Sequence, residues 1–170
     1  LGSGLFKTGR MLDPDQGVPF ALGSDVAGGP SVSLFKVMGD AYRVGMQNFV
    51  ALEAEDPCAN PTPEALRNRL DPFQLLYLAT YGAAKALYLD DWLGNFEPGK
   101  EADFIVVDPL KGSTLQTRAQ QDANEAVQHE SMAWLRDALF RMMLMGDERN
   151  IEATWIGGRP AVMHREEKRY

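Results

Sequence analysis

The sequence contains few of the side chains that usually build disulfides and metal centres. Its 170 residues include one cysteine, Cys58, and two histidines, His129 and His164. A single cysteine cannot form a disulfide within the chain, and this favours a reducing compartment such as the cytoplasm. The two histidines lie far apart, one in a polar stretch and one near a charged tail, so they do not form a metal-binding pair. The sequence therefore lacks a complete metal site of its own.

Two short motifs that begin like zinc signatures are also incomplete. The run "HESMA" at 129–133 has Ala133 where a zinc-protease helix requires its second histidine. Pro57-Cys58 opens like the P-C-x-x-C signature, but Ala, Asn and Pro follow instead of a second cysteine. Neither of these two zinc signatures is present.

Long apolar runs and excess positive charge are absent as well. No apolar stretch reaches the roughly 18 residues needed to span a bilayer. The formal net charge is −7, with 24 acidic and 17 basic side chains. Nucleic acids and anionic membranes both select clustered lysine and arginine, so this balance disfavours either as a partner. We expect a small-molecule ligand, no nucleic acid and no membrane.

The clearest pattern in the first half is a strand followed by a helix. The apolar segment "VPFALGS" at 18–24 predicts a strand that ends at Asp25, before two glycines. Ser31 or Ser33 can cap a helix whose apolar stripe runs from Leu34 to Phe49. This order of strand, short loop and helix is typical of an α/β protein.

The second half changes from helix to strand. Asp71 and Pro72 predict the start of a buried helix through "FQLLYLATYGAAKALYL" at 73–89. A strand is expected at 104–107, a helix from Ser131 to about Gly146, and a closing hairpin that turns at 157–158. The polar segments 53–70 and 109–130 are expected to be surface excursions. We expect the Met132, Leu135, Leu139 and Met142 side chains to share one face of the third helix.

Asp25 is the residue whose position most clearly predicts a functional site. A carboxylate at the C-terminal end of a strand lies where α/β folds place their active sites. The small residues after it leave room for a ligand, and the carboxylate can act as a metal ligand, a proton acceptor or both. An ordinary turn or helix cap is the alternative interpretation, because aspartate commonly serves in both. Local pattern alone leaves both open.

Longer segments resemble a known family. "LGSGLF" at 1–6, "ALGSDVAGGPS" at 21–31, "PGKEADFIVVD" at 98–108 and "GDERNIEATWIGG" at 146–158 are similar to the C-terminal portion of guanine deaminases, members of the amidohydrolase superfamily. The segment "PGKEADFIVVD" is general to that superfamily, and "LGSGLF" together with "GSDVAGGPS" narrows the resemblance. The segments that resemble the family least are 53–70 and 109–130.

The resemblance implies a fold, a reaction and a cofactor. It implies an α/β fold formed by the C-terminal part of a (β/α)₈ TIM-type barrel and part of a small β-sandwich. It implies zinc at the barrel mouth, with Asp25 as metal ligand and proton acceptor, and hydrolysis of guanine to xanthine and ammonia. It also implies a homodimer. No residue of this sequence is assigned to substrate binding.

The same resemblance divides the chain into four parts. Residues 1–93 would belong to the barrel, 94–112 to a strand of the sandwich, 113–146 to a loop and helix returning to the barrel, and 147–170 to the terminal hairpin of the sandwich. A complete barrel needs about 250 residues, and the chain opens without an initiator methionine. We therefore expect a longer protein to supply the other metal ligands, and expect these residues alone to be inactive.

Two alternatives remain open at this stage. One is a related aminohydrolase that acts on another ring amine, such as a triazine or an adenosine derivative. The other is a truncated, inactive piece with only a binding or assembly role. If the chain stands alone, we expect the apolar stripes at 34–49 and 73–87 to be partly uncovered.

Overall fold

The computed structural model describes residues 4–29, 31–53, 60–111 and 131–163. The helices are α1 (Thr8–Met11), α2 (Leu34–Glu53), α3 (Pro63–Arg67), α4 (Pro72–Ala79), α5 (Tyr81–Ala86) and α7 (Met132–Met145), with a short 3₁₀ helix at Glu148–Asn150. The strands are β1 (Phe104–Val107), β2 (Ile151–Ile156) and β3 (Arg159–Met163). The described part of the chain is thus mixed α/β, which confirms the expected class in its coarser form.

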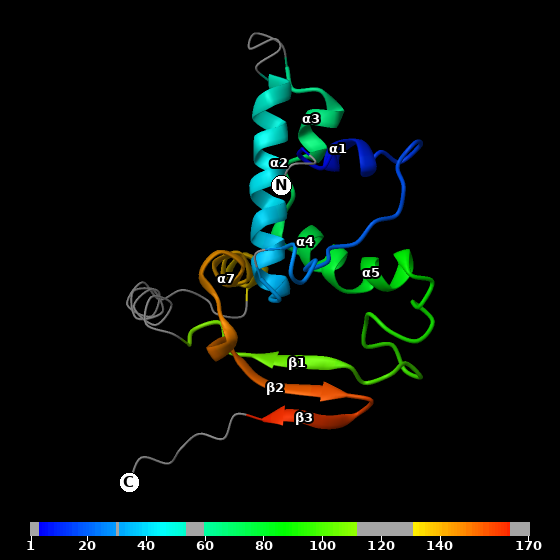
Figure 1. Ribbon diagram of the computed structural model, residues 1–170, viewed down its shortest axis with the longest axis vertical. Helices are drawn as coiled ribbons and strands as arrows, with labels where there is room; N and C mark the ends of the chain where they lie inside the picture. Colours follow the sequence, from blue (N-terminus) through cyan, green and yellow to red (C-terminus); the bar gives the residue numbers. More distant parts are fainter. Residues whose placement is uncertain (1–3, 30, 54–59, 112–130, 164–170) are drawn as a thin grey trace.

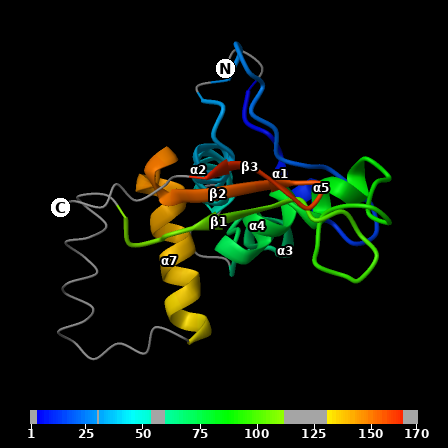
Figure 2. The same ribbon diagram turned by 90° about the horizontal axis from the view of Figure 1, so that it is seen from below.

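A helical layer and a small sheet make up the structure. Helix α2 is the long axis of the helical layer, with α1, α3, α4, α5 and α7 around it, and the sheet lies below (Figure 1). The buried apolar core joins α2, α4 and α7 and contains Met38, Leu70, Leu75, Leu139 and Met143. Seen from below, the three strands cross in front of the helices (Figure 2). Within the described residues, no helix is both long enough and apolar enough to cross a membrane.

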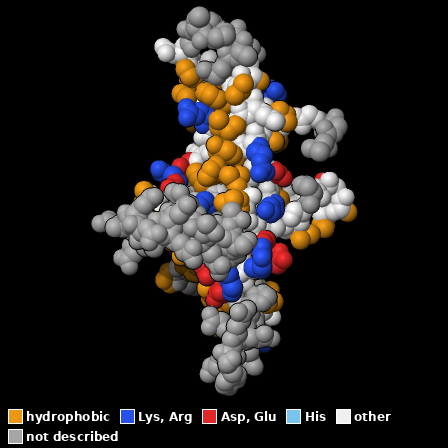
Figure 3. Space-filling model, turned by 90° about the vertical axis from the view of Figure 1, so that its left-hand side faces the viewer, with side chains coloured by type: hydrophobic (Ala, Val, Ile, Leu, Met, Phe, Trp, Pro, Cys, Tyr) orange, Lys and Arg blue, Asp and Glu red, His pale blue; other side chains and the backbone are white. Residues whose placement is uncertain are grey.

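Helix α2 forms where the sequence predicts it. It begins at Leu34, directly after Ser33, whose carbonyl accepts a hydrogen bond from the Val37 N–H at 3.2 Å. Met38 and Gly45 of the predicted stripe are buried, whereas Leu34 is 41% exposed. The apolar side of α2 therefore packs on the core along most, but not all, of its length. Figure 3 shows hydrophobic side chains exposed along the upper part of the face on which α2 lies.

The predicted helix at 73–89 is two helices rather than one. Asp71 forms the expected capping box with Gln74, and Pro72 occupies the first turn of α4. The helix breaks at Thr80, whose ψ is −100°, and α5 then ends at Ala86. The Thr80 hydroxyl donates to the Leu76 carbonyl at 2.7 Å, a side-chain bond that competes with regular helix geometry.

Burial of this helix pair is only partial. Leu75 and Leu78 are 0% and 5% exposed, but Tyr77 and Leu87 are 45% and 65% exposed. The expectation of a buried helix is therefore wrong for one side of α4 and α5. The expectation that the two stripes are partly uncovered is confirmed by Leu34, Tyr77 and Leu87.

The sheet confirms all three strands of the second half. Its order is β1-β2-β3, with both pairs antiparallel. Phe104 lies opposite Trp155, and their rings stack at 5.5 Å between centroids. A hollow of about 560 Å³, lined by Leu76 of α4, by Thr80 directly after it and by Phe104 and Ile105 of β1, lies between helix and sheet. The sheet is therefore held mainly by its own pairing.

The predicted strand at 18–24 is not formed. These residues are extended but belong to no strand, and the Leu22 N–H donates to the Leu78 carbonyl of α4 at 3.2 Å. A strand exists only when neighbouring strands accept and donate its backbone hydrogen bonds. No such neighbour lies beside 18–24 in the described part of the chain, so the strand prediction is wrong for this structure.

The segment 53–70 is not wholly a surface excursion. Residues 54–59, including Cys58, lie outside the described residues, but α3 follows at Pro63–Arg67. Thr62 caps α3 by accepting from the Ala65 N–H at 3.1 Å, and Ala65 is 1% exposed. The signal in the sequence is Thr62-Pro63-Glu64, a cap followed by proline in the first turn.

Helix α7 begins and ends as predicted but presents a rotated face. The Ser131 hydroxyl caps it by accepting from the Trp134 N–H, and Gly146 follows its last turn. Leu139 and Met142 are buried as expected, whereas Met132 and Leu135 are 67% and 46% exposed. Ala138 and Met143 are buried in addition. Residues 112–130, most of the predicted polar excursion at 109–130, lie outside the described residues.

Candidate active site

Asp25 lies at the start of a tight turn, on the surface. Its φ is +46°, in the left-handed region that aspartate enters more readily than most residues. Its carbonyl accepts hydrogen bonds from the Gly28 N–H, at 2.9 Å, and from the Gly29 N–H. Its carboxylate makes no hydrogen bond or ion pair with other described residues and is open to a ligand.

The alternative interpretation makes Asp25 an ordinary turn or helix-cap residue. The structure supports the turn and excludes the cap. Asp25 does not cap α2, because that helix begins only at Leu34, well beyond the turn. Its backbone does close the turn through Gly28 and Gly29. The side chain, by contrast, has no structural task among the described residues. The turn therefore accounts for the Asp25 backbone but not for its exposed carboxylate.

The described residues do not fit a zinc ion by themselves. Catalytic zinc normally has three protein ligands, and no group of three or more His, Cys, Asp or Glu side chains is close enough in the described residues to hold a metal ion. His129 and His164 lie outside the described residues. Asp25 is thus a single possible ligand, and this chain's described residues cannot carry a metal-dependent step alone.

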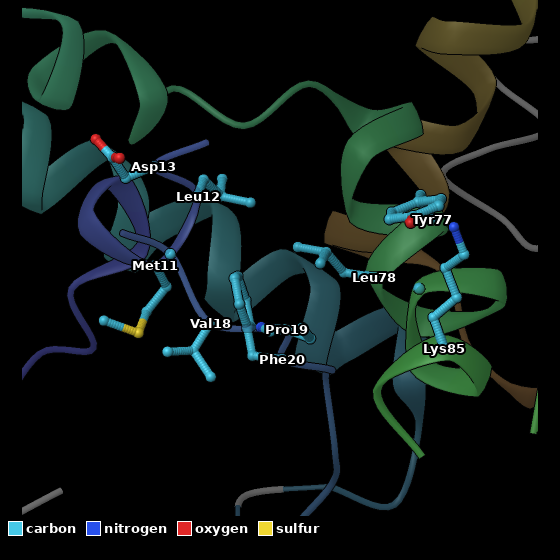
Figure 4. Close-up of a pocket in the computed structure, with 11 residues that line it drawn as sticks. Met11, Leu12, Asp13, Val18, Pro19, Phe20, Tyr77, Leu78 and Lys85 are labelled. Carbon is cyan, nitrogen blue, oxygen red and sulfur yellow. The ribbon is translucent and has the colours of Figure 1, made fainter. Parts of the chain in front are cut away.

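A cavity of about 330 Å³ lies on one side of the segment 18–24 (Figure 4). Met11, Val18 and Phe20 face Leu78 and Lys85 across it. A second hollow of about 220 Å³ involves Ala21, Leu22 and Gly23, together with the α2 side chains Val37, Ala41 and Val44. Neither hollow includes Asp25, and both have mostly apolar linings. They are spaces beside an unpaired extended segment rather than the site of the carboxylate.

Two aromatic rings link the first residues to the extended segment. The Phe6 and Phe20 rings lie 5.1 Å apart between centroids. The Phe6 carbonyl accepts a 2.7 Å hydrogen bond from the Asn48 side chain, which is 5% exposed. Because a buried amide needs a partner, this bond fixes Phe6 against α2. Asn48 therefore holds Phe6, and Phe6 in turn contacts Phe20 of the segment that precedes Asp25. The place of Asn48 in a helix with an apolar stripe does not reveal this role.

A second polar contact anchors α1 to α3. Asn68, 2% exposed, accepts from the Gly9 N–H at 2.8 Å, and Arg67 donates to the Gly9 carbonyl at 2.8 Å. Arg67 also pairs with Asp13 at 2.7 Å. The Asp13 pKa is held below its usual range by hydrogen bonds from the Asp15 and Gln16 N–H groups and by Arg67. These contacts hold residues 6–13 against the helical layer.

Comparison with known proteins places these features in one family. A family model described as "Amidohydrolase family" matches residues 1–161. The crystal structure of guanine deaminase from Bradyrhizobium japonicum is 40% identical with a TM-score of 0.85, and the match covers 96% of this chain and 35% of that chain. Guanine deaminase from Escherichia coli (strain K12) is 34% identical over 160 residues, 94% of this chain and 29% of its own length.

A third relative has the same extent. A probable guanine deaminase from Deinococcus radiodurans is 36% identical over 158 residues, covering 93% of this chain and 30% of its own length. The chain therefore spans about a third or less of the proteins that it matches. Since the family model covers nearly all of the sequence, the chain belongs to the amidohydrolase family.

Proposed function

We propose that these residues function as the C-terminal part of a guanine deaminase, which hydrolyses guanine to xanthine and ammonia. The observation that carries the proposal is the 40% identity to a guanine deaminase, with a TM-score of 0.85, over 96% of the chain. Identity at this level over a shared fold supports a shared reaction, whereas fold alone would not. The activity belongs to the complete protein, because the relatives are about three times longer.

In this proposal, Asp25 supplies a carboxylate to the active site. It is one metal ligand, the other ligands coming from residues outside this sequence, and it is also the proton acceptor. The attacking water gives a proton to Asp25 and its oxygen bonds to the ring carbon that carries the amino group, the C–N bond breaks, and the nitrogen leaves as ammonia after it has gained that proton. The exposure of the carboxylate and its freedom from partners among the described residues support this role.

The proposal also assigns the extended segment to a barrel. Residues 18–24 would form the eighth strand once neighbouring strands pair with them, and Asp25 would then lie at its C-terminal end, where barrels place catalytic groups. The division at 1–93, 94–112, 113–146 and 147–170 is part of this proposal, with the sheet β1-β2-β3 contributing to a β-sandwich. We also propose that the complete protein is a cytoplasmic homodimer.

The test compares two purified proteins. One is the longest polypeptide encoded with this sequence, and the other is the 170-residue chain alone. Each is supplied with zinc and guanine, and xanthine and ammonia are measured. We expect release of both products by the longer protein and none by the short chain. A longer protein that binds zinc but leaves guanine unchanged would contradict the proposal.

Competing substrates extend the same test. Adenosine and an amino-triazine are offered to the longer protein under the same conditions. The proposal expects guanine to have the highest kcat/KM. Preference for either competitor would replace guanine deamination by another ring-amine hydrolysis.

A further inference from the structure

The turn that carries Asp25 is built from two glycines that act differently. A Cβ at Gly29 would collide with the backbone oxygen of Ser24 and would lie 3.1 Å from that of Asp25. A backbone oxygen cannot rotate away, so any side chain at position 29 must shift the turn. Gly29 is therefore required for the fold-back that brings its N–H to the Asp25 carbonyl.

Gly28 makes room for the carboxylate itself. A Cβ at Gly28 would lie 2.6 Å from Asp25 Oδ2 and 3.1 Å from Cγ. The carboxylate thus lies over the bare Cα of Gly28, in space that any other residue would fill. Because these atoms belong to a side chain, rotation about the Asp25 torsions can relieve the contact at a lower cost than moving the backbone.

We infer that Gly28 and Gly29 are positioning residues for the Asp25 carboxylate: Gly29 fixes its backbone and Gly28 gives its side chain the space in which to lie. The inference rests on the proposed function, in which Asp25 takes part in guanine hydrolysis. The strained φ of Asp25, +46°, makes such positioning necessary. Without the two N–H donors on its carbonyl, the residue would relax toward the ordinary negative φ range and re-aim its side chain.

The kinetic test uses the complete enzyme with Gly29→Ala. We expect kcat for guanine to fall about 100-fold, because a displacement of about 1 Å at a reacting group has an effect of that size. KM should change by less than about threefold, since the carboxylate is assigned to the reaction rather than to binding. Gly28→Ala should lower kcat by a smaller factor, about 3- to 10-fold.

A structural control separates positioning from lost stability. A Cβ at Gly39, on α2, would lie 2.6 Å from the Met143 backbone oxygen, a clash of the same kind away from the Asp25 turn. Gly39→Ala should lower the unfolding temperature and leave kcat per folded molecule within about threefold of the parent. If Gly39→Ala reduces kcat as much as Gly29→Ala does, the positioning role is wrong.

The decisive measurement is a double-mutant cycle with Asp25→Ala. If the glycines act through the carboxylate, adding Gly29→Ala or Gly28→Ala to Asp25→Ala should change the residual kcat by less than about twofold. Additive losses in that background would overturn the inference. If Gly29→Ala does not fold, the Gly28→Ala cycle alone decides between these outcomes, because that substitution leaves the backbone in place.

A crystallographic comparison decides the inference even if guanine is not the substrate. In Gly29→Ala, or in Gly28→Ala if only that variant folds, the Asp25 carboxylate carbon should move by about 1 Å or more from its place in the parent. An unmoved carboxylate would refute the positioning role. An inactive parent enzyme would refute guanine deamination and leave this structural result valid by itself.

Discussion

Two apolar segments that both resemble strands in sequence, 104–107 and 18–24, differ in the structure, because only the first forms a strand. Phe104–Val107 forms β1, which pairs with β2 with one register shift between Val106 and Val107, and its phenylalanine stacks on Trp155. Residues 18–24 remain an extended chain that is joined to α4 by the 3.2 Å backbone bond from Leu22 to Leu78. Both sequences favour strand, and only one has a partner strand in the described chain.

This difference shows that a segment with strand propensity forms a strand only when another strand pairs with it. β1 has partners because the hairpin 151–163 follows within the same sequence and folds back on it. A strand in a parallel barrel instead depends on strands that come from distant parts of the chain. The proposal that 18–24 is a barrel strand therefore predicts that residues outside this sequence complete it.

The largest effect is expected at the end of the unpaired segment. In the complete enzyme, Asp25→Ala should lower kcat for guanine by at least about 10³-fold, the loss seen when one member of a catalytic set is removed. The matched control is Asp91→Ala, which removes an exposed carboxylate from the loop after α5. Equal, small effects of the two substitutions would remove Asp25 from the mechanism.

The next largest effect is expected in the apolar core that joins α2, α4 and α7. Leu75 is 0% exposed and packs in the cluster with Met38, Leu70 and Met143. Leu75→Ala should reduce the free energy of unfolding by about 2–5 kcal/mol, through lost burial and the cavity left behind. Leu66→Ala, at a position 48% exposed on α3, should cost far less. Urea denaturation of both variants measures the difference, and equal midpoints would show that this core does not stabilise the fold.

Proline substitution compares the two segments directly. Thr154→Pro removes an N–H from the central strand β2 and should cost about 1–3 kcal/mol in any protein that contains the sheet. Ala21→Pro should have almost no effect on the 170-residue chain, where 18–24 belongs to no strand. In the complete protein it should be as costly as Thr154→Pro. A large loss of stability from Ala21→Pro in the short chain would contradict this contrast.

The smallest effect is electrostatic and lies in the 3₁₀ helix that directly precedes β2. Asp147 accepts hydrogen bonds from the Arg149 side chain, at 2.6 to 3.2 Å, and from its N–H, which lower the Asp147 pKa from 3.8 to about 2. A lowered carboxyl pKa adds stability above the unfolded-state pKa and loses it as the pH falls through the folded-state value.

Asp147→Asn should therefore be less stable than the parent at neutral pH. The difference should shrink between about pH 4 and pH 2, the window set by the two pKa values. Denaturant midpoints at several pH values measure it. A difference that stays constant over this range would mean that the Asp147 carboxylate charge has no part in the stability of the protein.

The elements that the sequence predicts well are those whose determinants are local. The caps at Asp71 and Ser131 and the turn at 157–158 mark boundaries that the structure confirms. The break at Thr80 is not predicted, because a threonine inside an apolar pattern carries no strong stop signal. The predicted face of α7 is wrong at Met132 and Leu135 because burial depends on neighbours that periodicity does not identify.

The candidate site shows the same limit. Asp25 is identified from its place after an apolar run and from the family resemblance, and the structure adds its turn and its exposure. Asn48 and Asn68 are not identified from the sequence, because hydrogen bonds to the Phe6 carbonyl and from the Gly9 N–H join residues far apart along the chain. The assignment of Asp25 to a metal site stays a prediction.

Amide hydrogen exchange of the 170-residue chain and of the complete protein tests the central claim most directly. The amides of Phe20, Ala21 and Gly23, which donate no hydrogen bond within the described residues, are compared with those of β2 in both proteins. We predict slow exchange of the β2 amides in both proteins, with fast exchange of these three amides in the short chain and slow exchange of them in the complete protein. Fast exchange of these three amides in the complete protein would contradict the claim that this segment is a barrel strand completed from outside the sequence.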